Sequence, residues 1–196
     1  MRTLVIETAT PMLSVALFDG AALIGHHHAL IGRGHAEALL PAIAALPNGG
    51  RAARILVSCG PGSFTGLRVG IAAARALSFA WDAQLAGYPT LALIALSATE
   101  RVGAVAIPGG HGEWFVAEPG LPAISLPPAE ASARVTSFNV VGDAAAALVA
   151  ARGFGAAHPA TADARLALAL PADALLTDVT PLYGRAPDAK MAAHAA

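Results

Sequence analysis

The sequence predicts an α/β fold with two subdomains, and two observations carry that prediction. In the first half, three short hydrophobic strands come before a helix, a buried strand and a second helix. Between the buried strand and the second helix lies a glycine-rich turn at residues 58–70, which fits the passage from a strand into a helix. Three antiparallel strands followed by helix, strand and helix is the order of the ribonuclease-H-like fold, which actin and sugar kinases share.

The first three strands are predicted at residues 3–7, 13–18 and 22–29. Each is a short run of apolar residues, and the pair Asp19-Gly20 marks a tight turn between the second and the third. The first half therefore begins as an antiparallel meander.

The first helix is predicted over residues 35–46, where Leu39, Ile43 and Leu46 fall on one face. A short apolar run at residues 55–58 follows and predicts a buried strand parallel to the first. Helical spacing thus gives the first helix one apolar stripe, which can face either the sheet or a partner.

The second helix is predicted over residues 66–80. Its only charges, Arg68 and Arg75, lie seven residues apart and share a face, while apolar side chains cover much of the remainder. One sheet cannot cover that much apolar surface, so it packs either against the rest of the chain or against a partner.

The second half is predicted to hold three strands and two helices, the strands at residues 102–107, 113–117 and 138–141 and the helices near residues 143–152 and 162–170. Four prolines within residues 119–128 indicate a loop that crosses the surface. We assign residues 1–100 to an N-terminal ribonuclease-H-like domain with the partner-interface helices, and residues 101–196 to a smaller, degenerate C-terminal domain.

Composition excludes several classes of function. The chain has 196 residues, of which 56% are hydrophobic and 13% charged, so it is not an intrinsically disordered segment. A net charge of −1 without a basic block argues against autonomous capture of nucleic acid. A single cysteine, Cys59, excludes an internal disulfide, and no run of about twenty apolar residues predicts a membrane span. Because Met1 leads directly into a strand without a signal peptide, we expect a cytoplasmic protein.

The glycine-rich turn has two interpretations. Ser63 or Thr65 caps the following helix, and a helix start of this kind can hold an anion. A phosphate-binding P-loop, however, needs a lysine after its last glycine, whereas Leu67 and Arg68 follow Gly66 here. The other interpretation is a tight turn that lets the helix pack closely on its sheet.

Other candidate sites have weaker signals. Glu7, Thr8 and Thr10 stand where actin-like ATPases bind magnesium and nucleotide, so they are the candidates for a residual nucleotide site. The three consecutive histidines at residues 26–28 lie on a strand and point alternately to opposite faces, so we expect no metal site. Ser63 is not in a G-x-S-x-G nucleophile elbow, so nothing in the sequence favours a peptidase.

The spelling of several segments resembles one family. G-P-G-S-F-T-G-L-R-V-G at residues 60–70 resembles the signature of the bacterial TsaB (YeaZ) family, and residues 4–17, 34–41 and 87–91 resemble further segments in the same order. The signature loop comprises Gly60, Pro61, Gly62, Ser63, Thr65 and Gly66. Thr180-Pro181-Leu182-Tyr183-Gly184-Arg185 is similar to a family tail. The match is dense to about residue 96 and patchy beyond it, and Pro108-Gly109-Gly110-His111 replaces a usual Asp-Ala-Arg run.

The resemblance implies an actin-like ATPase fold with a reduced second domain, and a non-catalytic scaffold in the synthesis of threonylcarbamoyladenosine on tRNA. The implied partners are the transferase TsaD, the ATPase TsaE within the complex and, for the isolated chain, a second copy of itself. The implied contact with tRNA is through the complex only. The helices that the family uses as an interface correspond here to His35, Leu39, Ile43, Arg68, Val69 and Ala73. No metal or cofactor is implied, although weak ATP or ADP binding stays open.

The alternative hypothesis is a small ATP-binding kinase or hydrolase of the same superfamily. It would use Glu7, Thr8 and the glycine-rich turn at residues 60–66. A lone carboxylate with no nearby lysine leaves such a site incomplete, because Lys190 is the only lysine in the chain.

Overall fold

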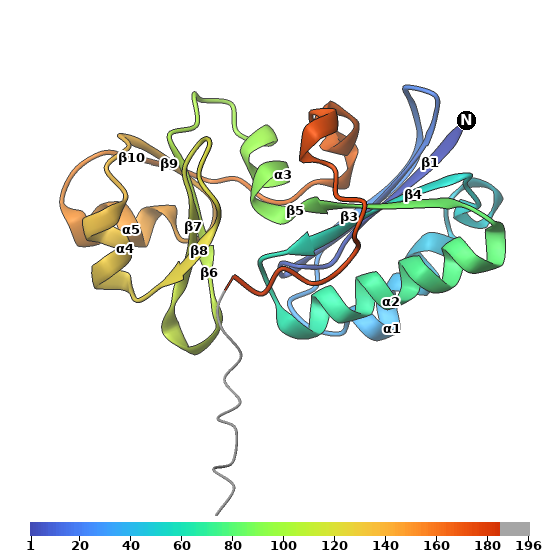
Figure 1. The fold of residues 1–196 in the computed structure, drawn as a ribbon, viewed down its shortest axis with the longest axis horizontal. Coiled ribbons are helices and arrows are strands. Elements are labelled where there is room, and N and C mark those ends of the chain that lie inside the picture. The colour runs from blue at the N-terminus through green and yellow to red at the C-terminus, as the bar shows by residue number, and fades with distance from the viewer. Residues whose placement is uncertain (185–196) are drawn as a thin grey trace, which may run out of the picture.

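A computed structural model describes residues 1–184 of the chain. Arg185 of the predicted family tail, Lys190 and the end of the predicted second domain lie outside the described residues. The described part forms two five-stranded sheets side by side, each with its own helices (Figure 1).

The first sheet combines an antiparallel meander with two parallel strands. It contains β1 (Arg2–Glu7), β2 (Met12–Asp19), β3 (Ala22–Leu30), β4 (Arg54–Gly60) and β5 (Gln84–Pro89), in the order β3-β2-β1-β4-β5. β1 pairs antiparallel with β2 and parallel with β4, and β4 pairs parallel with β5. β1 and β4 are buried along almost their whole length because helices cover both faces of the sheet. The predicted antiparallel meander and the buried parallel strand are confirmed, whereas no strand was predicted at the position of β5.

Two helices, α1 (His35–Ala44) and α2 (Phe64–Trp81), cover one face of this sheet (Figure 1). Leu39 and Ile43 of α1 and Ile71 of α2 pack into one core with the inner residues of the sheet. α1 ends two residues earlier than predicted, and a short 3-10 segment η1 (Pro47–Gly50) follows.

The other face of the first sheet packs against α3 (Thr90–Leu96) and the 3-10 segment η3 (Ala164–Ala169), and its core continues into the second sheet. The second sheet has the order β10-β9-β6-β7-β8. Its strands are β6 (Ala104–Pro108), β7 (Trp114–Ala117), β8 (Ile124–Leu126), β9 (Asn139–Val141) and β10 (Ala156–His158). α4 (Pro128–Arg134) and α5 (Ala145–Arg152) pack on the face of this sheet that points away from the first sheet.

The second half departs from prediction in three places, one of which is strand β10, where no element was predicted. The predicted helix at residues 162–170 is the 3-10 segment η3, which a 3-10 segment η4 (Ala172–Ala174) follows. The predicted proline-rich loop at residues 119–128 contains strand β8 and leads into α4, whose first residue is Pro128. Proline is tolerated at the first position of a helix because that position needs no N–H donor, so its presence did not exclude one.

The chain returns to the first sheet after β10. Leu176 forms two backbone hydrogen bonds with Gly87, and Val179 accepts a hydrogen bond from Arg75 of α2 at 2.8 Å. The Leu182 N–H donates to the carbonyl of Cys59 at 2.6 Å. Residues 176–184, here called the C-terminal strap, therefore pack on the N-terminal domain although the sequence assigned them to the second domain.

Candidate functional site

The carboxyl ends of the three parallel strands β1, β4 and β5 meet at one edge of the first sheet, next to the second domain (Figure 1). Glu7 ends β1, Gly60 ends β4 and Pro89 ends β5. Ligands of open α/β sheets bind in the crevice outside such strand ends. This edge, which carries both the signature loop and the predicted nucleotide residues, is therefore the candidate site.

The signature loop is bonded to the turn that follows β1. The N–H of Ser63 donates to the carbonyl of Ala9 at 2.7 Å, and the Thr8 hydroxyl donates to the carbonyl of Gly66 at 2.8 Å. The Ser63 hydroxyl accepts a hydrogen bond from the N–H of Gly66 at 3.2 Å, which caps α2. Several polar groups that could contact a phosphate are thus already hydrogen-bonded to other groups of the protein.

The glycines of the loop allow this close approach. A Cβ atom at Gly62 would collide with the carbonyl oxygen of Ala9, and one at Gly66 would collide with the carbonyl oxygen of Thr8. Gly70, one turn further along α2, lies in the same way against the Thr8 hydroxyl. The carbonyl oxygens of Ala9 and Thr8 therefore lie against Gly62 and Gly66, beside the first turn of α2. This geometry fits the tight-turn interpretation better than a phosphate cradle.

Glu7 lies below this turn and is completely buried. Burial raises the pKa of its carboxyl group from 4.5 to about 7, against the opposing effect of its hydrogen bonds. Oε1 accepts from the N–H of Ala9 at 2.6 Å, and the Tyr88 hydroxyl lies 3.5 Å from Oε2 and donates to the carbonyl of Ile6 at 2.9 Å. The carboxyl group therefore faces the protein interior and is inaccessible to a bound metal or nucleotide.

The other two residues of the predicted nucleotide site are also buried. Thr8 is bonded to Gly66, and the Thr10 hydroxyl accepts from the N–H of Met12 at 3.3 Å. The structure brings these residues and the signature loop together, but around a filled turn rather than an open cradle.

Sequence reasoning missed a polar network beside Glu7. The hydroxyl groups of Ser58 on β4 and Thr90, the first residue of α3, share a hydrogen bond of 2.6 Å, and Tyr88 on β5 pairs with Ser58. Tyr88 and Thr90 lie within residues 87–91, which the sequence analysis used only for the family resemblance. Hydroxyl-bearing residues at the ends of buried strands could have indicated the polar network without that resemblance. The neighbouring Cys59 thiol is buried, which raises its pKa to about 11, so it is protonated at neutral pH.

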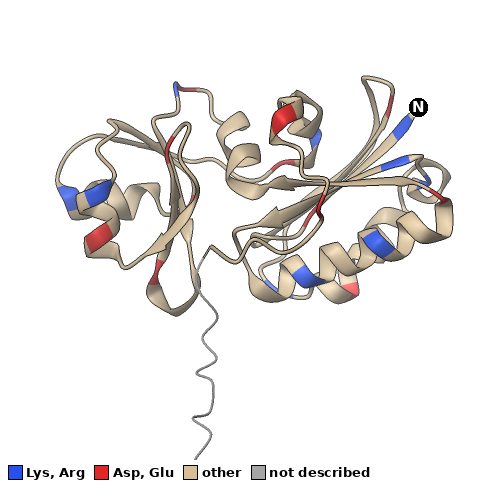
Figure 2. Ribbon diagram, in the orientation of Figure 1, with Lys and Arg blue, Asp and Glu red and all other residues tan. Residues whose placement is uncertain are grey.

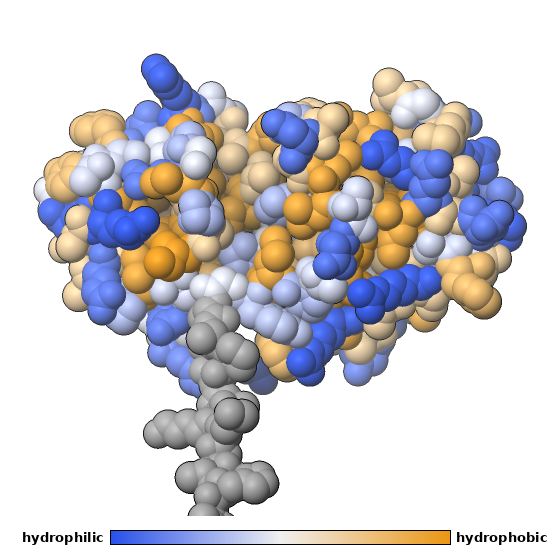
Figure 3. Space-filling model, viewed as in Figure 1, coloured by the Kyte–Doolittle hydropathy of each residue, from blue (hydrophilic) through white to orange (hydrophobic). Residues whose placement is uncertain are grey.

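A cleft of about 780 Å³ opens directly above this edge, between the two domains. Its walls come from α3, from the loop between β7 and β8, and from the end of the C-terminal strap. Hydrophobic residues dominate the surface between the domains in this view (Figure 3). The residues that line it include one charged side chain, Glu118.

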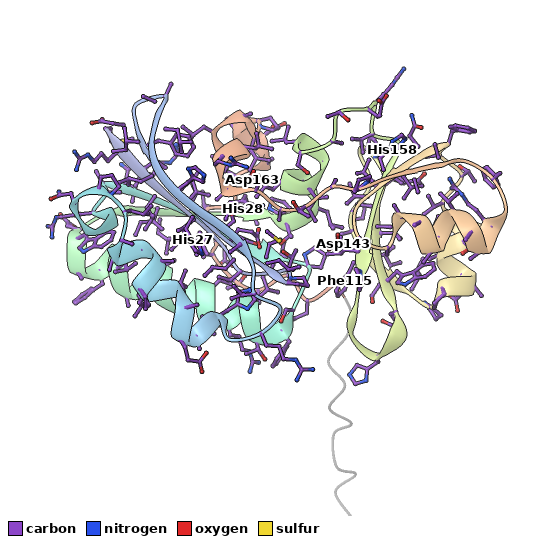
Figure 4. The ribbon with its side chains drawn as sticks, turned by 180° about the vertical axis from the view of Figure 1, so that it is seen from behind. His27, His28, Phe115, Asp143, His158 and Asp163 are labelled. Atoms are coloured by element: carbon purple, nitrogen blue, oxygen red, sulfur yellow. The ribbon has the colours of Figure 1, made fainter. Side chains whose placement is uncertain are left out.

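A serine, a histidine and an aspartate meet on the face of the first sheet that η3 covers. His28 Nδ1 lies 2.9 Å from the Ser14 hydroxyl and 3.9 Å from Asp163 Oδ1 (Figure 4). A hydrolytic triad uses the two different ring nitrogens for serine and aspartate, whereas both contacts here involve Nδ1. Ser14 is also fully buried and accepts from the N–H of Ala164 at 2.9 Å. The cluster therefore ties η3 to the sheet and does not present a nucleophile.

The predicted interface residues divide into two groups. His35, Leu39 and Ile43 are buried in the core, so they cannot form part of an exposed surface. The prediction for these three residues requires correction, because helical spacing identifies an apolar stripe without saying whether it faces the sheet or a partner. Val69 and Ala73 are half-buried, and Arg68 is exposed.

The outer face of the two helices is formed by other residues, most of them small and apolar. These are Ala36, Leu40, Pro41, Ala44, Ala72, Ala76, Phe79 and Ala80, here called the outer helix face. Leu40 is 53% exposed and Phe79 is 93% exposed. The same two helices also carry the exposed charged residues Glu37, Arg68 and Arg75.

Arg68 belongs to an aromatic cluster at the start of α2. Its guanidinium lies 3.7 Å above the centre of the Phe64 ring, and its Nε donates to the Tyr183 hydroxyl at 3.2 Å. The rings of Phe64 and Tyr183 lie 5.2 Å apart. The C-terminal strap is thus held against α2 by a cation–π contact and ring packing.

Within residues 1–184, no cluster of three His, Cys, Asp or Glu side chains is placed to hold a metal ion. No helix in the same part of the chain is long and apolar enough to cross a membrane. Charged residues are scattered over the two domains, with Arg68 and Arg75 along α2 (Figure 2).

Comparison with known proteins agrees with the fold. Residues 25–124 match the family model of TsaD, tRNA N6-adenosine threonylcarbamoyltransferase. YeaZ from Pseudomonas aeruginosa superposes with a TM-score of 0.75 at 24% identity, covering 93% of this chain and 99% of the other. An uncharacterised protein with similarity to the peptidase YeaZ from the same species superposes with a TM-score of 0.74 at 25% identity, covering 94% and 99%. The predicted actin-like, ribonuclease-H-like fold is confirmed.

Two relatives match in sequence, and each is named tRNA threonylcarbamoyladenosine biosynthesis protein TsaB. The Escherichia coli protein is 35% identical over 127 residues, which cover 60% of this chain and 54% of the relative. The Bacillus subtilis protein is 29% identical over 100 residues, which cover 48% and 44%. The matched region therefore spans about half the length of these relatives. Together with the TsaD model, which matches half of the chain, these findings show that the chain belongs to the TsaD family of proteins and, within it, to TsaB/YeaZ.

Proposed function

We propose that this chain takes part in the synthesis of N6-threonylcarbamoyladenosine at position 37 of tRNA, as a non-catalytic subunit that binds and activates TsaD. The names of the sequence relatives support the pathway. The observation that carries the subunit role is the outer helix face, where Phe79 is 93% exposed and Leu40 53% exposed among small residues. Burying such side chains against a partner stabilises a complex by about 25 cal/mol per Å² of apolar surface.

The geometry of the signature loop supports a subunit without catalysis. The turn after β1 packs against Gly62 and Gly66 at the start of α2, and Glu7 is completely buried. A kinase or hydrolase of this superfamily needs space there for phosphates and a metal ion. We therefore propose that chemistry on tRNA is performed by TsaD, and that this chain requires no ATP, ADP or metal for its own role.

The same outer helix face is the surface we assign to a second copy of the chain when TsaD is absent. One surface used for both partners makes the two assemblies mutually exclusive. TsaE would then join only the complex that contains TsaD. Because the positive charges are scattered over both domains, contact with tRNA is assigned to the assembled complex (Figure 2).

Co-purification with TsaD from the same cell tests the proposal, with Phe79→Glu and Leu40→Glu as interface variants. A glutamate on this face must be desolvated when a partner binds, so each variant should lose TsaD binding and tRNA modification while its circular dichroism stays unchanged. Phe138→Glu is the matched control, because Phe138 is 65% exposed and directly precedes β9 of the second sheet.

Normal TsaD binding by both well-folded interface variants would show that the interface lies elsewhere. Isothermal titration with ATP and magnesium distinguishes the alternative hypothesis of an ATP-binding enzyme from the proposed non-catalytic role. Micromolar affinity with turnover by the isolated chain would support a small kinase or hydrolase and contradict the non-catalytic role.

A further inference from the structure

The cleft between the domains has the size and the walls of a small-molecule site. Its volume of about 780 Å³ lies within the range of roughly 300 to 1,000 Å³ that is usual for ligand pockets. Leu91, Ala92 and Ala95 of α3 form one wall, and Ala117 and Leu121 belong to the opposite one. The end of the C-terminal strap also contributes to the lining.

The cleft is held open by rigid parts of the chain. The Leu182 N–H donates to the Cys59 carbonyl at 2.6 Å, and the Ser125 N–H donates to the Gly184 carbonyl at 3.2 Å, so the strap is bonded to both domains. Pro119 and Pro122 restrict the backbone of the β7–β8 loop. A site that keeps its shape without a ligand loses little conformational entropy when it binds one.

The charges around the cleft disfavour an anion. Glu118 is the charged residue of the lining, and its Oε1 accepts a hydrogen bond from the Ser137 hydroxyl at 2.7 Å. The guanidinium of Arg152, which interacts electrostatically with Glu118, donates its hydrogen bonds to main-chain carbonyls. Arg68 donates to the Tyr183 hydroxyl and stacks on Phe64. Within residues 1–184, the guanidinium groups of Arg152 and Arg68 are thus engaged with the protein, and Glu118 is the charged residue among those that line the cleft.

We infer that this cleft is a binding site for a neutral, apolar small molecule, aromatic or aliphatic, and that it rejects ligands with a carboxylate or phosphate group. The inference is independent of the role proposed for the outer helix face, which lies on the other side of the first sheet. It also differs from a residual nucleotide site, because a nucleotide would bring several negative charges next to Glu118.

Two probes that share the indole ring and differ by a carboxylate group test this inference, namely 3-methylindole and indole-3-acetate. Each is titrated into isotope-labelled protein and followed by the chemical shifts of the backbone amides. We expect 3-methylindole to shift the amides of residues 91–95 and 182–184, and to bind at least about fivefold more tightly than indole-3-acetate.

Three variants sharpen the test. Ala95→Trp fills the cleft and should abolish binding of 3-methylindole, whereas Ala151→Trp, at an exposed position of α5, should leave it unchanged. Glu118→Gln should reduce the difference in affinity between the two probes. Equal affinities for the probes, shifts that cluster away from the cleft, or binding that survives Ala95→Trp in a folded protein would each overturn the inference.

Discussion

Replacing Glu7 by glutamine should make the protein more stable at neutral and alkaline pH. The carboxyl group is completely buried, and burial raises its pKa from 4.5 to about 7. Glutamine has the same shape and carries no charge. Its amide oxygen can accept from the N–H of Ala9, and its NH₂ group can donate to the Tyr88 hydroxyl, which itself donates to Ile6.

The direction of this pH effect on stability follows from the pKa of Glu7 in the folded and unfolded states. The unfolded chain loses this proton near pH 4.5, whereas the folded chain keeps it until about pH 7. The contribution of Glu7 to stability is therefore fully present below pH 4.5 and is lost as the pH rises to about 7. At 1.36 kcal/mol for each pKa unit, the loss amounts to about 3 kcal/mol.

Urea unfolding of the wild type and Glu7→Gln between pH 5 and pH 8 measures this effect. The advantage in unfolding free energy of the variant over the wild type should grow by about 2–3 kcal/mol across this range and level off above pH 7. Glu37→Gln removes one negative charge from an exposed position of α1 and controls for the change in net charge. A difference between Glu7→Gln and the wild type that does not change with pH would refute the reasoning.

Three further predictions concern Gly66, Cys59 and the metal content of the purified protein. Gly66→Ala should destabilise the protein by about 1–3 kcal/mol in chemical unfolding, with or without ATP, because the added Cβ meets the carbonyl of Thr8; a gain of about 1 kcal/mol, usual for this change within a helix, would contradict the packing role. Cys59 should fail to react with a thiol reagent at pH 8 until the protein unfolds, since burial raises its pKa to about 11; rapid reaction of the native protein would show an accessible thiolate. Purified protein should carry no stoichiometric zinc or iron, and chelators should leave its melting temperature unchanged; one metal per chain, removed with a fall in stability, would show a site.

The elements of the first half could be predicted because their signals are local. Alternating apolar residues and Asp19-Gly20 define the hairpin of β2 and β3, and the start of α2 follows directly from its capping Ser63. Elements of the second half were harder to predict from the sequence. β8 and β10 have only three residues each, and their stability comes from pairing with other strands.

The side of each helix that meets solvent could not be read from the sequence. Leu39 and Ile43 share a helical face with Leu46, and this periodicity is the same whether that face meets a sheet or a partner. Only the position of α1 on the sheet decides that these residues belong to the core and that Leu40 is exposed.

By itself, the sequence determined the first four strands, the position of the signature loop and the family, because glycine spacing and hydrophobic periodicity are properties of the chain alone. Tertiary structure decided what the loop does. Gly62 and Gly66 could equally have approached a phosphate, and it is the return of the turn after β1 that brings the carbonyls of Ala9 and Thr8 into that space. The burial of Glu7 and the cleft between the domains depend in the same way on segments distant in sequence, whose contacts form only when the chain folds.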